Sequence, residues 1–268
     1  LVFKMGIAGV AIASILAQAI SAVMVVMSLS AESMEYRFRF RQMRFEGDIL
    51  SRTIRIGLPA GFQSIMYSLS NMLIQASVNR FGTDTVASWV VLGKVDGINW
   101  MILGALGIAS MTFVGQNYGA GRLDRIQKSL KLSLLIGVCI SIVFGGSLLL
   151  FGWPLFGLFT SDDNVLAMSM QLLWYFAPFY WMFVPIEIIS GALRGMGDTL
   201  IPTIITATGI CVFRVAWIYT VVPLHNSMFT VSLSYPISWV LTAIAFAIYY
   251  MMARKKLIAN APKPAALD

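Results

Sequence analysis

One stretch of otherwise apolar sequence carries polar side chains at regular spacing. Gln63, Tyr67, Asn71, Gln75 and Asn79 follow one another every four residues. Residues four apart share one face of an α-helix, so their side chains form a polar stripe along a helix. Unmet hydrogen bonds are costly in hydrocarbon, and such a stripe must therefore face protein or water. The spacing predicts either hydrogen bonds between helices or the wall of a polar cavity.

Four ionisable side chains, Lys94, Asp96, Glu187 and Arg214, also lie inside apolar segments. Charges in a membrane are costly, and they usually pair or mark a functional site. At about 1.5 Å per residue from each segment's midpoint, Asp96 and Arg214 have matching depths, which predicts a buried ion pair. Lys94 points to another helix face than Asp96. Helix-fixing ion pairs and a relay for a proton or cation are both open; for Glu187, pairing with nearby Arg194 is the alternative.

The elements that must hold these residues are membrane helices. The chain has 268 residues, 58% hydrophobic and 12% charged, whereas soluble domains carry about 25% charged residues. Apolar runs long enough to cross a bilayer lie at about 6–28, 57–79, 86–112, 130–151, 166–190, 200–222 and 228–251. The predicted fold class is therefore an all-α integral membrane protein with seven transmembrane helices.

Basic residues fall mainly on one side of these helices. If the connection 31–56 is cytoplasmic, the same side receives 15 of the 19 basic residues, and only Lys4 and Arg80 lie on the other side. This bias predicts a cytoplasmic C-terminus and a multi-pass protein of the cell (inner) membrane. The connection 31–56, in which arginines alternate with aromatic residues, is interpreted as an interfacial anchor.

Nothing in the sequence is typical of an enzyme. His225 is the only histidine, and the two cysteines, Cys139 and Cys211, lie far apart, so no acid–base set or cluster of metal ligands is visible. The glycine-rich segment 115–121 lacks the Gly-Lys-Ser/Thr ending of a nucleotide-binding loop. We expect no catalytic residue, no cofactor and no nucleic-acid partner, and leave the question of a bound metal open.

Three connections carry unusual glycine-rich motifs: IGLPAG at 56–61, GQNYGAG at 115–121, and RGMGDT at 194–199 followed by Pro202. Glycines at such places permit tight turns and close helix contacts. In their order and spacing the motifs resemble the MATE family of multidrug and toxic-compound extrusion transporters, of the NorM/DinF-like bacterial type. The resemblance covers about Gly6 to Lys256.

The resemblance implies a MATE-like helical bundle of two six-helix lobes, of which this chain is the C-terminal portion. Residues 1–30 would be the last helix of the N-lobe, 31–56 a basic cytoplasmic linker, 57–252 the six-helix C-lobe and 253–268 a cytoplasmic tail. The expected partners are the lipid bilayer, the missing N-terminal lobe of the same protein, and small cationic or amphipathic substrates. The implied activity is secondary active export in exchange for H⁺ or Na⁺ by alternating access.

The family pattern also directs attention to site residues. NorM-like members place acids where Tyr67 and, approximately, Phe183 stand here, so coupling is expected to use the missing lobe or other acids. The candidates for ion coupling or for buried charge are Lys94, Asp96, Glu187 and Arg214. The candidates for the substrate cavity are Gln63, Tyr67, Asn71, Gln75 and Trp100.

Two other interpretations stay open. One is an exporter or flippase for an endogenous metabolite or a lipid-linked substrate on a related fold. The other, from a different class, is a structural membrane subunit, which the polar and charged residues inside the helices disfavour.

Overall fold

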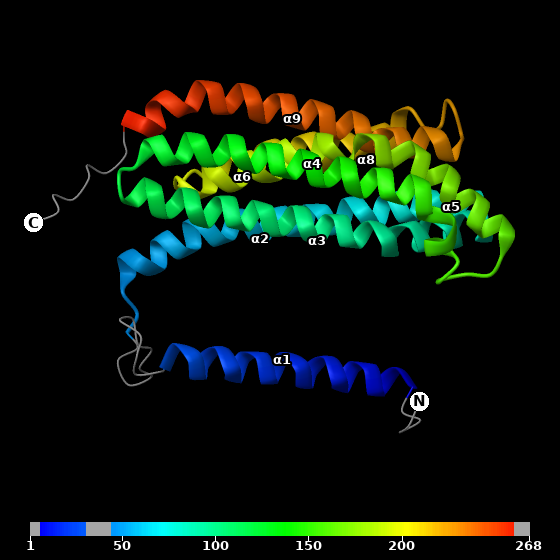
Figure 1. Ribbon diagram of the computed structural model, residues 1–268, viewed down its shortest axis with the longest axis horizontal. Helices are drawn as coiled ribbons and strands as arrows, with labels where there is room; N and C mark the ends of the chain where they lie inside the picture. Colours follow the sequence, from blue (N-terminus) through cyan, green and yellow to red (C-terminus); the bar gives the residue numbers. More distant parts are fainter. Residues whose placement is uncertain (1–5, 31–43, 260–268) are drawn as a thin grey trace, which may run out of the picture. The chain divides into compact units, whose positions relative to one another are not determined.

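The computed structural model describes residues 6–30 and 44–259, and the regular structure within them is helical (Figure 1). Five long α-helices run without interruption: α1 (Gly6–Ser30), α2 (Gly47–Val78), α3 (Thr83–Gly119), α4 (Leu123–Phe156) and α9 (Met228–Ala259). A single 3₁₀ turn, η2 (Asn79–Phe81), follows α2. The all-helical fold class is confirmed.

Two further spans are composite. The first consists of α5 (Asp163–Phe176), the 3₁₀ segment η3 (Ala177–Phe183) and α6 (Val184–Gly195). Pro178 and Pro185 lie at the starts of its last two parts, and a proline removes a backbone donor from the helical ladder. The second consists of α7 (Leu200–Thr206), the π-helical segment η4 (Ala207–Val212) and α8 (Phe213–Thr220).

Six of the seven expected spans are long and apolar enough to cross a membrane: they include α1, α3, α4, α9 and the two composite spans. The seventh, α2, has 32 residues and is long enough. It is missing from that set because the stripe of Gln63, Asn71 and Gln75 lowers its mean hydropathy.

The chain divides into two compact units, Leu1–Thr53 and Ile54–Asp268. Helix α2 begins ten residues before the expected start at 57, so part of the expected linker 31–56 is helical. Residues 31–43 of the predicted anchor 31–56 and residues 260–268 of the predicted tail 253–268 lie outside the described residues.

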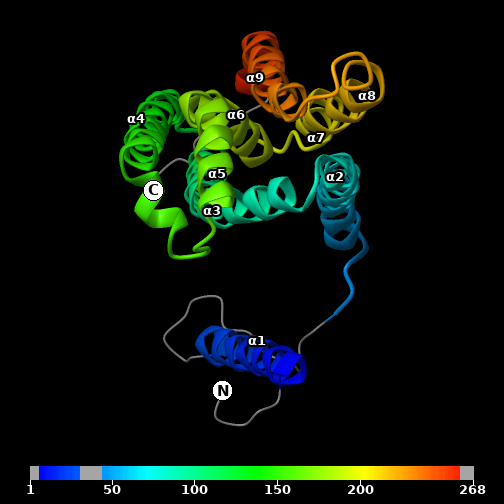
Figure 2. The ribbon, with the colours of Figure 1, turned by 90° about the vertical axis from the view of Figure 1, so that its right-hand side faces the viewer.

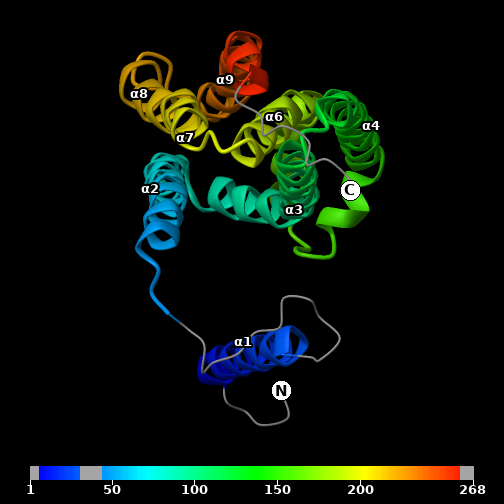
Figure 3. The same cartoon turned by 90° about the vertical axis from the view of Figure 1, so that its left-hand side faces the viewer.

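Within the second unit, the helices run side by side around an interior that two end-on views show from opposite ends (Figures 2 and 3). Helix α4 lies on the outer side of α3, α5 and α6, whereas α2 lies between α3 and the α7–α8 span. Near its C-terminal end α2 packs through Ile74 and Val78 against Ile218, Val222 and Val231. This arrangement leaves the polar stripe of α2 directed along the interior of the bundle.

Glycines bring α3 and α6 together, and two of them, Gly115 and Gly195, belong to the motifs. Gly191 faces the backbone of Gly107, and an added Cβ at Gly115 would lie 3.3 Å from the carbonyl oxygen of Gly195. Gly121 and Gly197 form the tight turns, with φ of 68° and 90°, values that suit glycine because it has no Cβ. The expected roles are therefore confirmed for the turns at Gly121 and Gly197 and for the contact of Gly115 with Gly195. They are not confirmed for the first motif, where an added Cβ at Gly57 or Gly61 meets nothing within 4 Å.

Candidate functional site

The interior of the second unit contains a cavity of about 530 Å³. Its walls come from α2, α3, the α5–η3–α6 span, α8 and α9. The lining residues are Tyr67, Asn71, Gln75, Trp89, Leu92, Gly93, Asp96, Trp100, Phe176, Phe183, Glu187, Arg214, Tyr235 and Trp239. A volume of this size is within the range of pockets that hold drug-sized molecules.

Aromatic rings form much of the cavity wall. Trp100 packs edge-to-face against Phe183 and Trp239, with ring centroids 4.9 and 5.6 Å apart. Phe176 packs in the same way against Tyr235 at 5.1 Å. Mutual contacts of this kind hold aromatic rings in fixed orientations. The wall therefore offers preorganised flat surfaces to an apolar or aromatic ligand.

The polar stripe of α2 supplies polar groups to the wall of the same cavity. Tyr67, Asn71 and Gln75 line the cavity, and the Gln75 side-chain amide donates a 2.9 Å hydrogen bond to Asn79. Gln63 lines a second, smaller cavity of about 120 Å³ instead and accepts a 2.5 Å hydrogen bond from Arg194. Residues of the stripe therefore line two cavities, and one of them, Gln63, also forms a hydrogen bond between helices.

The predicted ion pair between Asp96 and Arg214 is wrong. Both residues line the cavity, but the described residues include no contact between them within 4 Å, and each has other partners. Asp96 accepts a hydrogen bond from the Tyr180 hydroxyl. The Arg214 Nε donates to the Ser238 hydroxyl at 2.9 Å. Equal depth along two helices did not mean that the side chains faced each other.

Glu187 links the two cavities, because it lines both. Its carboxylate has no hydrogen bond or ion pair with another described residue, so the alternative of pairing with Arg194 is not formed at contact distance. A Cβ at Gly107 would lie 2.9 Å from its Oε2, which shows that the small residue on α3 makes room for the carboxylate. The carboxylate of Glu187 therefore lies at both cavities without a hydrogen bond to another described residue.

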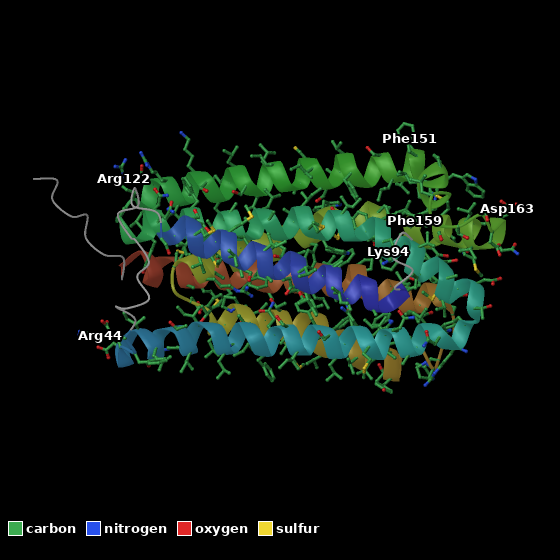
Figure 4. The ribbon with its side chains drawn as sticks, turned by 90° about the horizontal axis from the view of Figure 1, so that it is seen from below. Arg44, Lys94, Arg122, Phe151, Phe159 and Asp163 are labelled. Atoms are coloured by element: carbon green, nitrogen blue, oxygen red, sulfur yellow. The ribbon has the colours of Figure 1, made fainter. Side chains whose placement is uncertain are left out.

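Lys94 is exposed and does not line the cavity. Figure 4 shows it in the half of the bundle that contains Phe159 and Asp163, away from Arg122. Its long side chain can reach the membrane interface while its stem stays apolar. Lys94 is therefore separated from Asp96, as its position two residues away predicts.

Sequence reasoning missed several wall residues, among them Trp89, Phe176, Tyr235 and Trp239. For Phe176 the available signal was the pair Pro178 and Pro185, which marks a break in its own span and hence a change in which residues face inward. The other three residues lie on α3 and α9, and these prolines say nothing of them. Among the described residues, no group of three or more His, Cys, Asp or Glu side chains could hold a metal ion.

A cavity with aromatic walls and buried charges, enclosed by membrane-spanning helices, is typical of membrane transporters. The chain belongs to the MatE family, since the family model MatE matches residues 59–220. Members of this family are transporters and not enzymes.

Named relatives agree with this membership. The chain is 25% identical over 266 residues to the probable multidrug resistance protein YoeA of Bacillus subtilis (strain 168), covering 94% of this chain and 56% of that protein. It is 23% identical over 211 residues to a probable multidrug resistance protein NorM of Thermotoga maritima, covering 79% and 45%. The chain thus spans about half the length of these curated relatives.

Solved structures show the same fold. A crystal structure of MATE in complex with MaL6 superposes with a TM-score of 0.87 at 16% identity, covering 97% of this chain and 59% of that one. A MOP superfamily transporter from Pyrococcus furiosus, described by the reverse polarity of its binding pocket, gives 0.86 at 17% identity, covering 96% and 58%. At these identities the likeness concerns the fold alone.

Proposed function

We propose that the aromatic and polar cavity binds amphipathic compounds, and that the chain provides this site in a secondary active multidrug exporter. The observation that carries the proposal is the composition of the wall, where Tyr67, Asn71 and Gln75 face a cluster of packed aromatic rings. Aromatic faces attract cations and apolar bodies, and the amide oxygens accept hydrogen bonds. The names of the multidrug resistance relatives support the same function.

Ion exchange would use the two acids of the cavity, Asp96 and Glu187. Each carboxylate can carry a proton or contribute oxygen ligands to Na⁺, and a substrate cation would compete with that ion for the same negative charge. Such competition in one cavity is the physical basis of exchange by alternating access. The proposal leaves both H⁺ and Na⁺ as coupling ions.

The experiment that tests the substrate site measures dye binding to the purified chain in detergent. Replacing Tyr67 and Asn71 together by alanine removes an aromatic face and an amide oxygen from the wall. A desolvated cation–π contact is worth about 2 kcal/mol, so the Kd for rhodamine 6G should rise at least about tenfold. Fluorescence anisotropy of the dye provides the measurement, with empty micelles subtracted.

The matched control for this experiment is Met72→Ala. Met72 is 64% exposed and does not line the cavity. Its replacement should leave the Kd within about twofold. An unchanged Kd in the Tyr67→Ala, Asn71→Ala double variant would contradict the assignment of this wall to the substrate.

Orientation is a further part of the proposal: the turn between α3 and α4 and the C-terminal tail are cytoplasmic, in the inner membrane. In Figure 4 Arg122 and Asp163 lie at opposite ends of the bundle. The end near Arg122 also carries exposed Arg125 and Lys128, as expected of a cytoplasmic side.

Cysteine labelling in intact cells tests this orientation. In a chain whose two native cysteines are replaced by alanine, a cysteine at position 225 should react with a membrane-impermeant maleimide added outside. A cysteine at position 120 should react only after the cells are opened. Both positions are exposed loop or turn residues, so the reverse pattern of labelling would overturn the orientation.

A further inference from the structure

Arg214 is a cavity residue whose hydrogen-bonding groups are mostly not used by the other described residues. Its side chain is 4% exposed, and it lines the cavity. The Nε donates to Ser238 at 2.9 Å, and that hydroxyl donates in turn to the Tyr235 carbonyl at 2.7 Å. A guanidinium has five N–H donors, so four remain, and no described residue accepts a hydrogen bond from them.

The surroundings hold the guanidinium in place without neutralising it. Its Cζ lies 3.8 Å from the ring centroid of Tyr235 and 5.9 Å from that of Trp239. Stacking on these rings covers the faces of the guanidinium and leaves its edge, which carries the N–H groups, for other partners. No described acid lies within 4 Å of it. The Trp239 Nε1–H is also buried without an acceptor among the described residues.

A buried cation without a counter-charge is costly, and removing one partner of a buried ion pair leaves a similar defect. A carboxylate or phosphate would supply both the charge and two parallel acceptors, which match the guanidinium fork. Water could accept the hydrogen bonds but would not neutralise the charge. The aromatic walls also favour a ligand that carries its anion on an apolar body.

We propose that Arg214 binds an anionic group of the transported compound, a carboxylate or a phosphate joined to an aromatic or apolar body. This inference rests on the proposed function, since it assumes that substrates enter the cavity. The same compounds can carry a cationic group toward Glu187, which lines the same cavity. The favoured substrates are therefore zwitterions rather than simple cations.

Two dyes that share one xanthene ring system test the proposal. Rhodamine 19 has a free carboxylate, and rhodamine 6G is its ethyl ester, so the pair differs in the anionic group. The purified chain in detergent should bind rhodamine 19 at least about fivefold more tightly than rhodamine 6G. Arg214→Gln should weaken rhodamine 19 binding about tenfold and so abolish the preference for rhodamine 19 over rhodamine 6G, because the ester has no carboxylate contact to lose. A tenfold change corresponds to one strong hydrogen-bonded contact.

Three controls show whether a change in dye binding by Arg214→Gln results from the loss of the guanidinium. Circular dichroism and thermal unfolding of Arg214→Gln show whether the variant still folds. Arg214→Lys keeps the charge but lacks the planar fork, so it should restore part of the preference for the carboxylate. Arg125→Gln removes an exposed arginine of α4 that does not line the cavity and should change neither Kd.

Competition against bound rhodamine 19 identifies the source of the anion. Displacement by dioctanoyl phosphatidylglycerol, lost in Arg214→Gln, would support a lipid phosphate as the ligand. Displacement by benzoate or phenyl phosphate alone would support a free small molecule.

Two kinds of contradicting result distinguish a failure of the anion site from a failure of the proposed function. Equal affinity of the unmodified chain for the two dyes, or an equal loss of both in Arg214→Gln, would overturn the anion site and leave the cavity as a binding site. Binding of neither dye by the unmodified chain would overturn the proposed function and this inference together.

Discussion

A chain carrying both Asp96→Asn and Glu187→Gln is expected to bind rhodamine 6G at least about thirtyfold more weakly than the unmodified chain. These residues are the acids that line the cavity. Charge-assisted contacts are about twice as strong as neutral ones, and thirtyfold corresponds to about 2 kcal/mol. In the double variant the positively charged Arg214 remains in the cavity wall without the two acids, and its charge repels a cation. The measurement is the anisotropy titration with the purified chain.

The single variants distinguish the two acids. The Glu187 carboxylate has no hydrogen bond or ion pair within the part of the chain that the structure describes, so Glu187→Gln should account for most of the loss. Asp96 accepts a hydrogen bond from Tyr180, and Tyr180→Phe, which keeps the carboxylate but removes this orienting contact, should have a smaller effect. Asp163→Asn changes an exposed acid at the end of the bundle and serves as the control. An unchanged Kd in the double variant would exclude both acids from cation binding.

The second large effect concerns stability. Gly191→Ala should lower the free energy of unfolding of the helical bundle by about 1–3 kcal/mol, the usual cost of an overpacked contact. The added Cβ would meet the backbone carbonyl of Gly107, and backbone cannot turn aside as a flexible side chain can. The separation of α3 and α6 would have to increase. Thermal unfolding in detergent, followed by circular dichroism, measures the change.

Gly97→Ala is the matched control, because Gly97 lies on α3 as well and an added Cβ there meets nothing within 4 Å. Alanine favours a helix over glycine by about 1 kcal/mol, so this variant should be as stable as the unmodified chain or more stable. Destabilisation of the same size at both positions would show that the α3–α6 contact is not the cause.

The sequence predicts the spans well because each depends on local composition. The apolar runs at 86–112 and 130–151 lie within α3 and α4. The turn glycines Gly121 and Gly197 have the positive φ that their motifs suggest. The stripe on α2 was visible because polar residues stand out in an apolar helix with a period near four. Length, apolarity and period are all properties of a short window.

The rest of the cavity depends on how helices rotate against one another, which a short window does not contain. Asp96 and Arg214 have matching depths, yet their side chains have separate partners. The 3₁₀ segment η3 has a different number of residues per turn from an α-helix, and so it shifts which residues of its span face inward. The π-helical segment η4 does the same just before Arg214.

The central claim is that the polar stripe of α2 lines a substrate cavity, and water access to the stripe tests it most directly. Water should reach such a cavity when it is empty, and a bound ligand should shield the stripe from water. In a chain without its native cysteines, a cysteine at position 71 should react with a charged, membrane-impermeant thiosulfonate, and rhodamine 6G should slow that reaction several-fold. A cysteine at the neighbouring position 72, on the exposed face outside the cavity, should react slowly and with no protection by the dye. Equal reactivity of the two positions, or the lack of protection at position 71, would contradict the account.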